Sequence, residues 1–365
     1  MLQPKRITTS PAGKWAGTEY STIDSWNLGC KLFVVLYVDH FGLHSADGAF
    51  LYDLPIGASA EPRWSRSDPN ILYHHAGNTM YEYNVATRNG GVLHEFTGYS
   101  EVSGKGEGDI SRNSMALYAD GYAFLYNLAS GVKGPTLSTR GYSVESLYTI
   151  DGMILVSWGE KGTERYKGME LFDAASTMRF IRQIEAVNGH KSVGHDVDGS
   201  PIMVWTNSDQ ADADPACENG IEKVNILTGE RKCLLSLAWS LAVHVSCGPG
   251  FAIVETYSAP GSPPVPYQDA ILRVPYDGSP VEELCKHGSK ITSYTAQPKA
   301  TLSGDGTKVL YSSNVAAPNR PDYCDVYLID LQPQAVAIPP SPEIPSPPGG
   351  SRTYGGGRGH RGKIH

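Results

Sequence analysis

Residues Gln297–Leu331 read QPKATLSGDGTKVLYSSNVAAPNRPDYCDVYLIDL. This pattern predicts a strand, a tight turn, a second strand, a polar loop and a third strand, whereas each earlier segment of the same type predicts four strands. The chain then becomes a proline-rich tail, which cannot pair in a sheet. A three-stranded unit leaves N–H and C=O groups unpaired at its edge, so a fourth strand must come from elsewhere. We expect the N-terminal residues Lys5–Ser10 (KRITTS) to supply it.

The same kind of unit recurs along the whole chain at a period of about 40–47 residues. The seven copies are Tyr20–Leu54, Glu61–Phe96, Glu107–Leu137, Glu145–Ile184, His190–Leu237, Ala242–Leu284 and Gln297–Leu331. Asp-Gly pairs such as Asp151-Gly152 and Asp305-Gly306 lie between apolar runs, where tight hairpins need residues that tolerate positive φ. The sequence therefore predicts an all-β fold, a seven-bladed β-propeller closed by an N-terminal strand. We expect the propeller to span residues 1–332 and an extended or disordered Pro-rich linker and Gly/Arg-rich basic tail to span residues 333–365.

Charge and apolar content exclude several classes of function. The chain carries −8 and its last residues carry +4, through Arg352, Arg358, Arg361 and Lys363, so the rest carries −12. An acidic body argues against nucleic-acid binding by the propeller, which would need Lys and Arg to neutralise phosphates. The longest apolar run, Leu32–Val38, is too short to span a membrane. No export signal is readable, and the compartment stays open, with an extracellular or periplasmic location favoured.

The tail and the cysteines each allow two interpretations. The tail is either a solvated end or an assembly arm that docks on a neighbouring copy and makes a homo-oligomer. The six cysteines have no CxxC spacing, which argues against zinc and redox motifs. Cys217 with Cys233, and Cys247 with Cys285, could form bridges, or all could be buried as small apolar side chains.

Three segments carry a family resemblance: EPRWSRSDPNILYHH (Glu61–His75), HDVDGSPIMVW (His195–Trp205) and ATLSGDGTKVLYSS (Ala300–Ser313). They resemble the W-S-x-D-G-x-x-I-x-F-x-S unit of TolB-type, WD40-like propeller repeats. This resemblance implies the propeller fold. It does not imply a function, because propellers host many unrelated activities.

The chain also resembles, more weakly, the oligogalacturonate-lyase type of propeller, which cleaves uronate chains by β-elimination. In that family closely spaced His residues, with a nearby Gln, bind a metal just before the Asp-Gly turn of the last repeat. This chain has Gln297 and Lys299 there and no His, so we predict no metal site of that kind and no cofactor. His190 falls in a region where the family has a His.

Loop lengths point to one face of the ring. If the first strand of each blade begins on a face that we call the upper face, the connections between second and third strands also lie there. These connections are long in the last four units: Gly159–Gly168, Ser208–Asn219, Ser258–Asp269 and Asn314–Tyr323. Long loops on a rigid scaffold usually carry recognition, so we expect the functional surface on the upper face of units four to seven.

The polar residues expected on this face suggest a saccharide site. Trp158, Trp205 and Tyr257 would offer flat faces to sugar rings, and Glu107, Asp109 and Asn207 would supply hydrogen bonds. A uronate lyase also needs a base near the C5 proton and a cation that neutralises the carboxylate. The candidates for the base are His190, His244 and Tyr294, and those for the cation are Arg63, Lys191 and Lys299.

The competing interpretation is structural: polar side chains around a propeller channel often bond to neighbouring blades, and Arg63 with Glu107 or Asp109 could form such a belt. The functional hypotheses are therefore a saccharide-binding or saccharide-processing propeller, including a polysaccharide lyase acting on acidic glycans, and a non-catalytic scaffold. The scaffold could assemble through its tail or be a sensor of the TolB-like kind.

Overall fold

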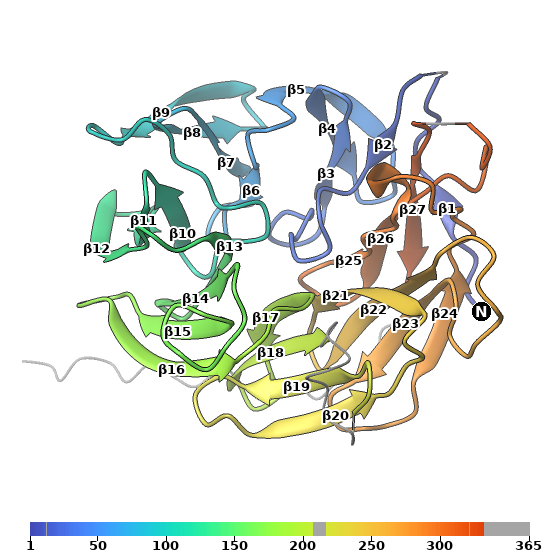
Figure 1. Ribbon diagram of the computed structural model, residues 1–365. Coiled ribbons are helices and arrows are strands. Elements are labelled where there is room, and N and C mark those ends of the chain that lie inside the picture. Colours follow the sequence, from blue (N-terminus) through green and yellow to red (C-terminus); the bar gives the residue numbers. More distant parts are fainter. Residues whose placement is uncertain (12, 207–216, 321, 332–365) are drawn as a thin grey trace, which may run out of the picture.

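Seven small antiparallel sheets stand around a ring in the computed structural model, which describes residues 1–11, 13–206, 217–320 and 322–331 (Figure 1). Each sheet is one blade of a β-propeller, as the sequence predicted. Blade 1 consists of β2 (Ala16–Gly17), β3 (Leu32–Tyr37), β4 (His40–Ser45) and β5 (Phe50–Gly57). Blade 2 consists of β6 (Arg63–Trp64), β7 (Ile71–Ala76), β8 (Thr79–Asn84) and β9 (Asn89–Glu95). Blade 3 has three strands, β10 (Ser114–Ala119), β11 (Tyr122–Asn127) and β12 (Val132–Ser138).

Blades 4 to 7 follow in the same order around the ring. Blade 4 consists of β13 (Val144–Ile150), β14 (Met153–Trp158), β15 (Met169–Asp173) and β16 (Arg179–Glu185), and blade 5 of β17 (Lys191–His195), β18 (Pro201–Thr206), β19 (Ile221–Asn225) and β20 (Arg231–Leu235). Blade 6 consists of β21 (Leu241–Cys247), β22 (Phe251–Ser258), β23 (Ala270–Pro275) and β24 (Glu282–Lys286). Blade 7 consists of β25 (Thr301–Leu302), β26 (Lys308–Ser313), β27 (Asp325–Asp330) and the N-terminal β1 (Lys5–Arg6). A short 3₁₀-helix, η2 (Tyr294–Ala296), precedes blade 7.

The N-terminal strand closes the ring, which confirms the prediction from Lys5–Ser10. β1 pairs antiparallel with β27, Lys5 opposite Leu328 and Arg6 opposite Tyr327. The buried carboxylate of Asp325 fixes this closure: Oδ1 accepts from Thr8 Oγ1 at 3.0 Å and from the Ser10 N–H at 2.8 Å, and Oδ2 accepts from Arg6 Nε at 2.8 Å. The exposed edge of β27 is thereby covered by the chain's own first residues.

Blade 3 differs from the prediction, because the expected inner strand around Glu107–Ser111 is coil in the structure. Two backbone carbonyls of this segment accept hydrogen bonds from side chains instead of from the backbone of a neighbouring strand. Thr22 Oγ1 donates to the Glu107 carbonyl and Arg63 Nε donates to the Gly108 carbonyl, both at 2.7 Å. Gly108 lies directly against the carbonyl of Leu147, so a Cβ has no room there. Glycine at this position permits the close approach of the two backbones, and the segment does not form a regular strand.

A segment of blade 1 crosses the centre of the ring. The sequence pattern predicted the first strand of that blade at residues 20–27 (YSTIDSWN), but the inner strand is the shorter β2 and lies before them. Thr18 Oγ1 donates to Lys299 O in blade 7 at 2.9 Å, and the Asp24 N–H donates to Asp109 Oδ2 at 2.9 Å. Tyr20 reaches His190 in blade 5 at 3.0 Å. These contacts join the crossing segment to blades 3, 5 and 7.

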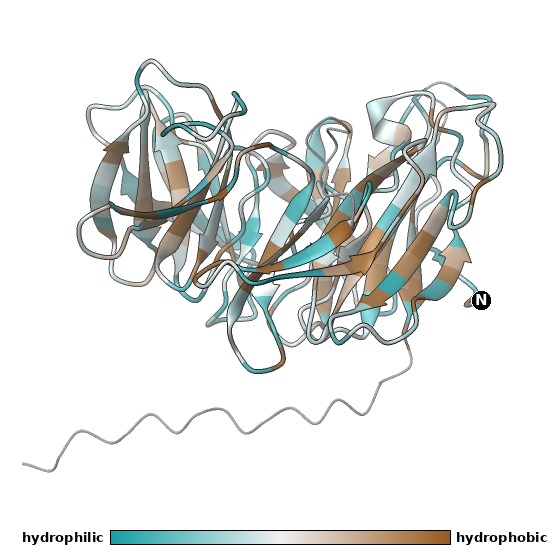
Figure 2. Ribbon diagram, turned by 60° about the horizontal axis from the view of Figure 1, so that its bottom comes forward, coloured by the Kyte–Doolittle hydropathy of each residue, from teal (hydrophilic) through white to brown (hydrophobic). Residues whose placement is uncertain are grey.

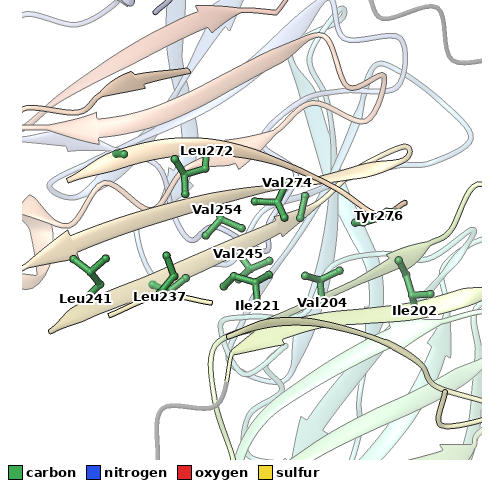
Figure 3. Packing of buried hydrophobic residues seen from close by; sticks show 13 residues of the cluster. Ile202, Val204, Ile221, Leu237, Leu241, Val245, Val254, Leu272, Val274 and Tyr276 are labelled. Atoms are coloured by element: carbon green, nitrogen blue, oxygen red, sulfur yellow. The ribbon is translucent and has the colours of Figure 1, made fainter. Parts of the chain in front are cut away.

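Apolar side chains between neighbouring blades form the core, seen as brown bands along the strands in Figure 2. Figure 3 shows the contact between blades 5 and 6, where Val204 and Ile221 face Val254 and Leu272. Burying a side chain of this size contributes about 1.5–3 kcal/mol. The ring therefore holds together through interfaces shared by adjacent sheets.

Two cysteine predictions have different outcomes. Cys217 and Cys233 form a disulfide, with 5.6 Å between their Cα atoms. The bridge suggested between Cys247 and Cys285 is wrong: both thiols are free. Cys247 ends the inner strand β21 and Cys285 lies on the outer strand β24, with two strands between them.

Within the part of the chain that the structure describes, no helix has the length and apolar character to cross a membrane. The tail, residues 333–365, and the assembly role suggested for it lie outside the described residues.

Candidate functional site

The upper face carries the long connections that the sequence indicated. The β7–β8 and β10–β11 connections are two-residue turns, whereas β14–β15, β22–β23 and β26–β27 are joined by about ten residues each. The connection from β18 to β19 falls largely outside the described residues. The inner strands β17 and β21 also start on this face, so that their first side chains meet the long loops.

Two histidines and two tyrosines from three blades meet at the upper end of the channel; we call them the His–Tyr cluster (Tyr20, His190, His244, Tyr257). The ring centroids of His190 and His244 are 4.8 Å apart, edge to face. His244 stacks on Tyr257 at 5.6 Å and meets the edge of Tyr20 at 5.4 Å. The Tyr20 hydroxyl lies 3.0 Å from Nδ1 of His190. The structure thus brings the predicted bases His190 and His244 together.

Burial sets the charge state of the cluster. It lowers the pKa of His190 to about 4, with further lowering by His244 and Lys191, so this imidazole is neutral near pH 7. Burial alone would raise the pKa of Glu255, but His244 at 3.3 Å and the Ala300 N–H at 3.0 Å outweigh it and lower that pKa. Glu255 is therefore an ionised carboxylate that fixes His244 and the start of blade 7.

Lys299 is a buried cation without a counter-ion. Its residue is 5% exposed, and among the described residues its ammonium has no ion pair or hydrogen bond. The exposed ring of Tyr294 lies over Nζ, with 4.1 Å to the ring centroid. Burial lowers the pKa of Lys299, against the pull of Glu255 and Glu19. Its backbone has φ 46°, a conformation that non-glycine residues seldom adopt and that often marks functional positions.

The other predicted cation that reaches this face is Lys191. Its Nζ lies 4.0 Å from Glu107 Oε2, over the ring of Tyr148 at 5.2 Å, and donates to the Gly189 carbonyl at 3.2 Å. Glu107 also accepts from the Tyr148 hydroxyl. Lys191 is thus partly neutralised, and Lys299 is the cation of this pair that an incoming anion would meet unopposed.

Arg63 does not serve as a free cation. Its side chain is fully buried and its Nη1 donates to both carboxylate oxygens of Glu19, at 2.8 and 2.9 Å. Burial raises the pKa of Glu19 to about 7, although Arg63 acts in the opposite direction. Arg63 therefore forms a structural ion pair, as the belt interpretation expected. Its partner is Glu19 rather than Glu107 or Asp109, and the sequence did not suggest Glu19.

Asp109 is also misplaced by the sequence argument, because it lies at the lower end of the channel. There Arg66 joins it to Asp24, with distances of 2.7 and 2.8 Å, beside a cavity of about 350 Å³. Asp109 lies in coil rather than in the expected inner strand, so the position expected from a regular strand does not apply to it.

A larger hollow of about 760 Å³ lies on the lower face between blades 5 and 6, where Lys223 pairs with Asp196 and Arg273 with Glu282. The charges at both lower hollows largely satisfy one another, so the candidate site remains on the upper face.

The two predicted tryptophan platforms are not available. Trp158 and Trp205 are buried in the core, where their indole N–H groups donate to Glu170 at 2.9 Å and to Glu222 at 3.2 Å. Trp158 ends β14 and Trp205 is the last residue but one of β18, and both side chains pack into the contacts between blades. Tyr257 keeps a partly exposed ring, and Asn207 lies outside the described residues. Tyr20 was missed, because no pattern in the sequence shows that the crossing segment reaches blade 5.

The described residues do not fit the metal site that the lyase resemblance would imply. No group of three or more His, Cys, Asp or Glu side chains is arranged to hold a metal ion in this part of the chain. Where the family has its metal-binding His residues, this chain has Lys299, whose positive charge opposes a cation. No chemical step is therefore assigned to a metal.

The chain matches no family model and no curated protein sequence. Among solved structures it is similar to an oligogalacturonate lyase from Vibrio parahaemolyticus, with a TM-score of 0.65 and 12% identity over 90% of this chain and 93% of that chain. It is also similar to an oligogalacturonate lyase in complex with manganese, with a TM-score of 0.62 and 12% identity over 91% of this chain and 96% of that chain. U3-55K gives a TM-score of 0.56 and 12% identity over 90% and 98% of the two chains. Identities this low show the fold alone: the protein is a seven-bladed β-propeller of the shape shared by these lyases and by WD40-repeat proteins.

Proposed function

We propose that the upper end of the channel binds a saccharide that carries a carboxylate, with Lys299 as the anchor of that carboxylate. The observation that supports this is the buried ammonium of Lys299, which lacks a counter-ion among the described residues and lies under the exposed ring of Tyr294. A buried charge is costly unless it is paired, so such a site favours a ligand that supplies the missing anion. The rings of Tyr294 and Tyr257 give flat apolar faces of the kind that sugars contact.

The reaction to test at this site is β-elimination. His190 is neutral near pH 7, and in the tautomer in which Nδ1 donates to the Tyr20 oxygen its Nε2 carries the lone pair. A neutral imidazole and an ammonium are the two groups that such a reaction needs: a proton acceptor and a cation that stabilises the negative charge developing on the uronate. The resemblance in shape to oligogalacturonate lyases is consistent with this chemistry. A propeller that binds the same saccharide without cleaving it is the alternative.

Calorimetric titration with trigalacturonate and with the corresponding neutral trisaccharide tests the binding. We expect the wild-type protein to prefer the acidic ligand and Lys299→Met to lose at least tenfold in affinity for it. Lys308→Met is the matched control, since Lys308 is on the lower face in a pair with Asp330. Equal affinity for the two sugars, or unchanged binding by Lys299→Met, would overturn the proposal. Ultraviolet absorbance of an unsaturated product then separates a lyase from a binding protein.

A further inference from the structure

The hollow of about 350 Å³ at the lower end of the channel is lined by residues of all seven blades. Its volume lies near the lower end of the range for ligand pockets, roughly 300–1,000 Å³, so it has room for one small molecule. The side chains of Arg112 and His195, which line it, are 78% and 43% exposed. A ligand can therefore enter from the lower face, on the side of the ring away from Lys299.

Three buried hydroxyls line this hollow, one from each of the inner strands β13, β17 and β21: Thr149, Ser192 and Ser246, none more than 5% exposed. Each hydroxyl oxygen accepts the backbone N–H of a residue in a neighbouring blade. The donors are Ala116 to Thr149 at 2.6 Å, Cys247 to Ser192 at 3.0 Å and Leu302 to Ser246 at 3.1 Å. Among the described residues, none of the three O–H groups has an acceptor. A buried donor without an acceptor costs free energy, so the hollow favours a ligand that brings acceptor oxygens.

The charged side chains of the hollow are paired with one another. Arg66 joins Asp24 to Asp109, as described above. Asp151 lies 3.0 Å from Arg112 Nη2 through Oδ1 and 2.8 Å from His195 Nε2 through Oδ2. Because every carboxylate of the lining already has an arginine partner, a ligand need not bring a charge into the hollow.

The paired carboxylates can still accept hydrogen bonds. An ionised carboxylate offers about four lone-pair positions. Among the described residues, Asp24 uses two of them, for the Trp26 N–H at 2.9 Å and for Arg66 at 2.8 Å. Asp151 also uses two, for Arg112 and His195. The hollow therefore presents acceptors for ligand hydroxyls as well as donors for ligand oxygens.

The chemistry of the lining favours a neutral ligand with many hydroxyl groups. Two guanidinium groups face three carboxylates, so an anionic ligand would meet an excess of negative charge. A cationic ligand would find each carboxylate already in an ion pair. The side chains of Val193 and Leu302 add an apolar side to the hollow. A ring sugar matches this lining, because its hydroxyls both donate and accept and its C–H faces can pack on aliphatic side chains.

We propose that the lower end of the channel is a second binding site, which takes a neutral monosaccharide. Oxygens of the sugar accept from the hydroxyls of Thr149, Ser192 and Ser246, and its own hydroxyls donate to Asp24 and Asp151. The volume of the hollow limits the ligand to a single ring. This site is separate from the Lys299 site and does not depend on the proposed function.

Titration of the full chain with glucose, galactose, mannose and xylose, followed by imidazole NMR shifts, tests the site. His195 lines the lower hollow and reports on it, whereas His190 reports on the upper end of the channel. We expect at least one of the four sugars to shift His195 and to leave His190 unchanged. Glucuronate and glucosamine, which carry a carboxylate or an ammonium, are expected to bind there more weakly than glucose.

Ser192→Ala/Ser246→Ala removes two of the three hydroxyl donors and is expected to lower the affinity for the sugar about tenfold or more. Ser312→Ala is the matched control, because Ser312 is also buried and accepts a backbone N–H, from Thr18 at 2.9 Å, but does not line the hollow. Thr149→Val, which keeps the shape of the side chain, is a second variant with one donor removed. Thermal melts of all three variants check that the fold is intact.

Three results would refute the inference. If none of the four sugars shifts His195, water alone fills the hollow. If a sugar shifts His190 and leaves His195 unchanged, it binds at the upper end of the channel. Folded Ser192→Ala/Ser246→Ala and Thr149→Val that bind as tightly as Ser312→Ala would show that the hydroxyls do not hold the ligand. Tighter binding of glucuronate than of glucose at His195 would contradict the neutral character of the ligand, and none of these results bears on Lys299.

Discussion

The hydroxyl of Tyr20 lies 3.0 Å from Nδ1 of His190, so a residue of the first blade meets a residue of the fifth across the ring. The inner edges of the blades face one another around the centre of the ring (Figure 1), and this contact joins two blades that are not neighbours there. It places His190 against His244 and makes the His–Tyr cluster depend on the segment that crosses the channel.

Removing the Tyr20 hydroxyl should release the His190 ring. We expect Tyr20→Phe to lower stability by about 1 kcal/mol and to change the balance of His190 tautomers. Imidazole ¹⁵N shifts measure that balance directly. Tyr81→Phe, at a tyrosine that stacks on His74 in blade 2, is the control. Unchanged His190 nitrogen shifts in Tyr20→Phe would show that the hydroxyl does not position this ring.

Replacing Lys299 by an apolar side chain should stabilise the fold while it removes binding. A buried ammonium without a counter-ion carries a desolvation cost, which exceeds the ~0.5–1 kcal/mol of its contact with Tyr294. We expect Lys299→Met to raise the free energy of unfolding by about 1 kcal/mol in urea denaturation. Lys308→Met, at an exposed pair, should change little. A clear loss of stability in Lys299→Met would mean that the charge has a structural partner.

Ring closure should depend on Asp325. Its carboxylate holds Arg6, Thr8 and Ser10, and Asp325→Ala removes the acceptor of the buried Thr8 hydroxyl and Ser10 N–H and the counter-ion of Arg6. We expect a loss of about 3–5 kcal/mol, with faster amide exchange along β27. Asp330→Ala is the control, because Asp330 is exposed and pairs only with Lys308 among the described residues. Equal effects of the two substitutions would contradict this role for Asp325.

The disulfide should make the melting temperature sensitive to reductant. Cys217 and Cys233 are 16 residues apart in sequence, and closing a loop of that length contributes about 3 kcal/mol through the unfolded state. We expect thermal melts of the wild-type protein to fall by several degrees on reduction. Cys217→Ser/Cys233→Ser should melt at the lower temperature and ignore the reductant. A drop of the same size in that variant would assign the effect to another group.

A buried carboxylate near Arg231 should give the protein a pH-dependent stability. Burial raises the pKa of Glu185 to about 7 from 4.5, although Arg231 acts in the opposite direction. The folded state therefore holds a proton that the unfolded chain releases, so this contribution is complete below pH 4.5 and is lost as the pH rises through 7.

We accordingly expect the stability of Glu185→Gln, relative to wild type, to improve between pH 5 and pH 8 by about 1–3 kcal/mol. Denaturation curves at the two pH values measure it, with Glu95→Gln as an exposed control. A difference that stays constant with pH would contradict the raised pKa.

The blade architecture was readable from the sequence because its signals are local. Alternating apolar runs and Asp-Gly turns specify each hairpin, and the three-stranded end of the chain at Leu331 required a partner strand. The pattern predicted two inner strands that are absent, at residues 20–27 in blade 1 and at residues 107–111 in blade 3, where side-chain bonds replace ladder bonds.

The site was only partly readable, because it depends on which side of a strand faces the channel. His190, Lys191 and Lys299 begin inner strands or lie just before them, and His244 lies within β21; the structure brings His190 and His244 into contact. Trp158 ends a second strand, where successive side chains point to opposite faces, so a shift of one residue moves a side chain from the core to the surface. The prediction that Trp158 faces the ligand site was wrong, because its side chain is buried in the core.

Closure through β1 also has a consequence for how the protein is made. Arg6 and Asp325 are 319 residues apart, so on the ribosome the first strand emerges long before its partner exists. At 5–20 residues per second this delay lasts roughly 15–60 s. During that time the nascent protein is an open arc of blades in which β1 has no partner strand, and it is exposed to chaperones and to other growing chains. The ring can close only after β27 has been translated.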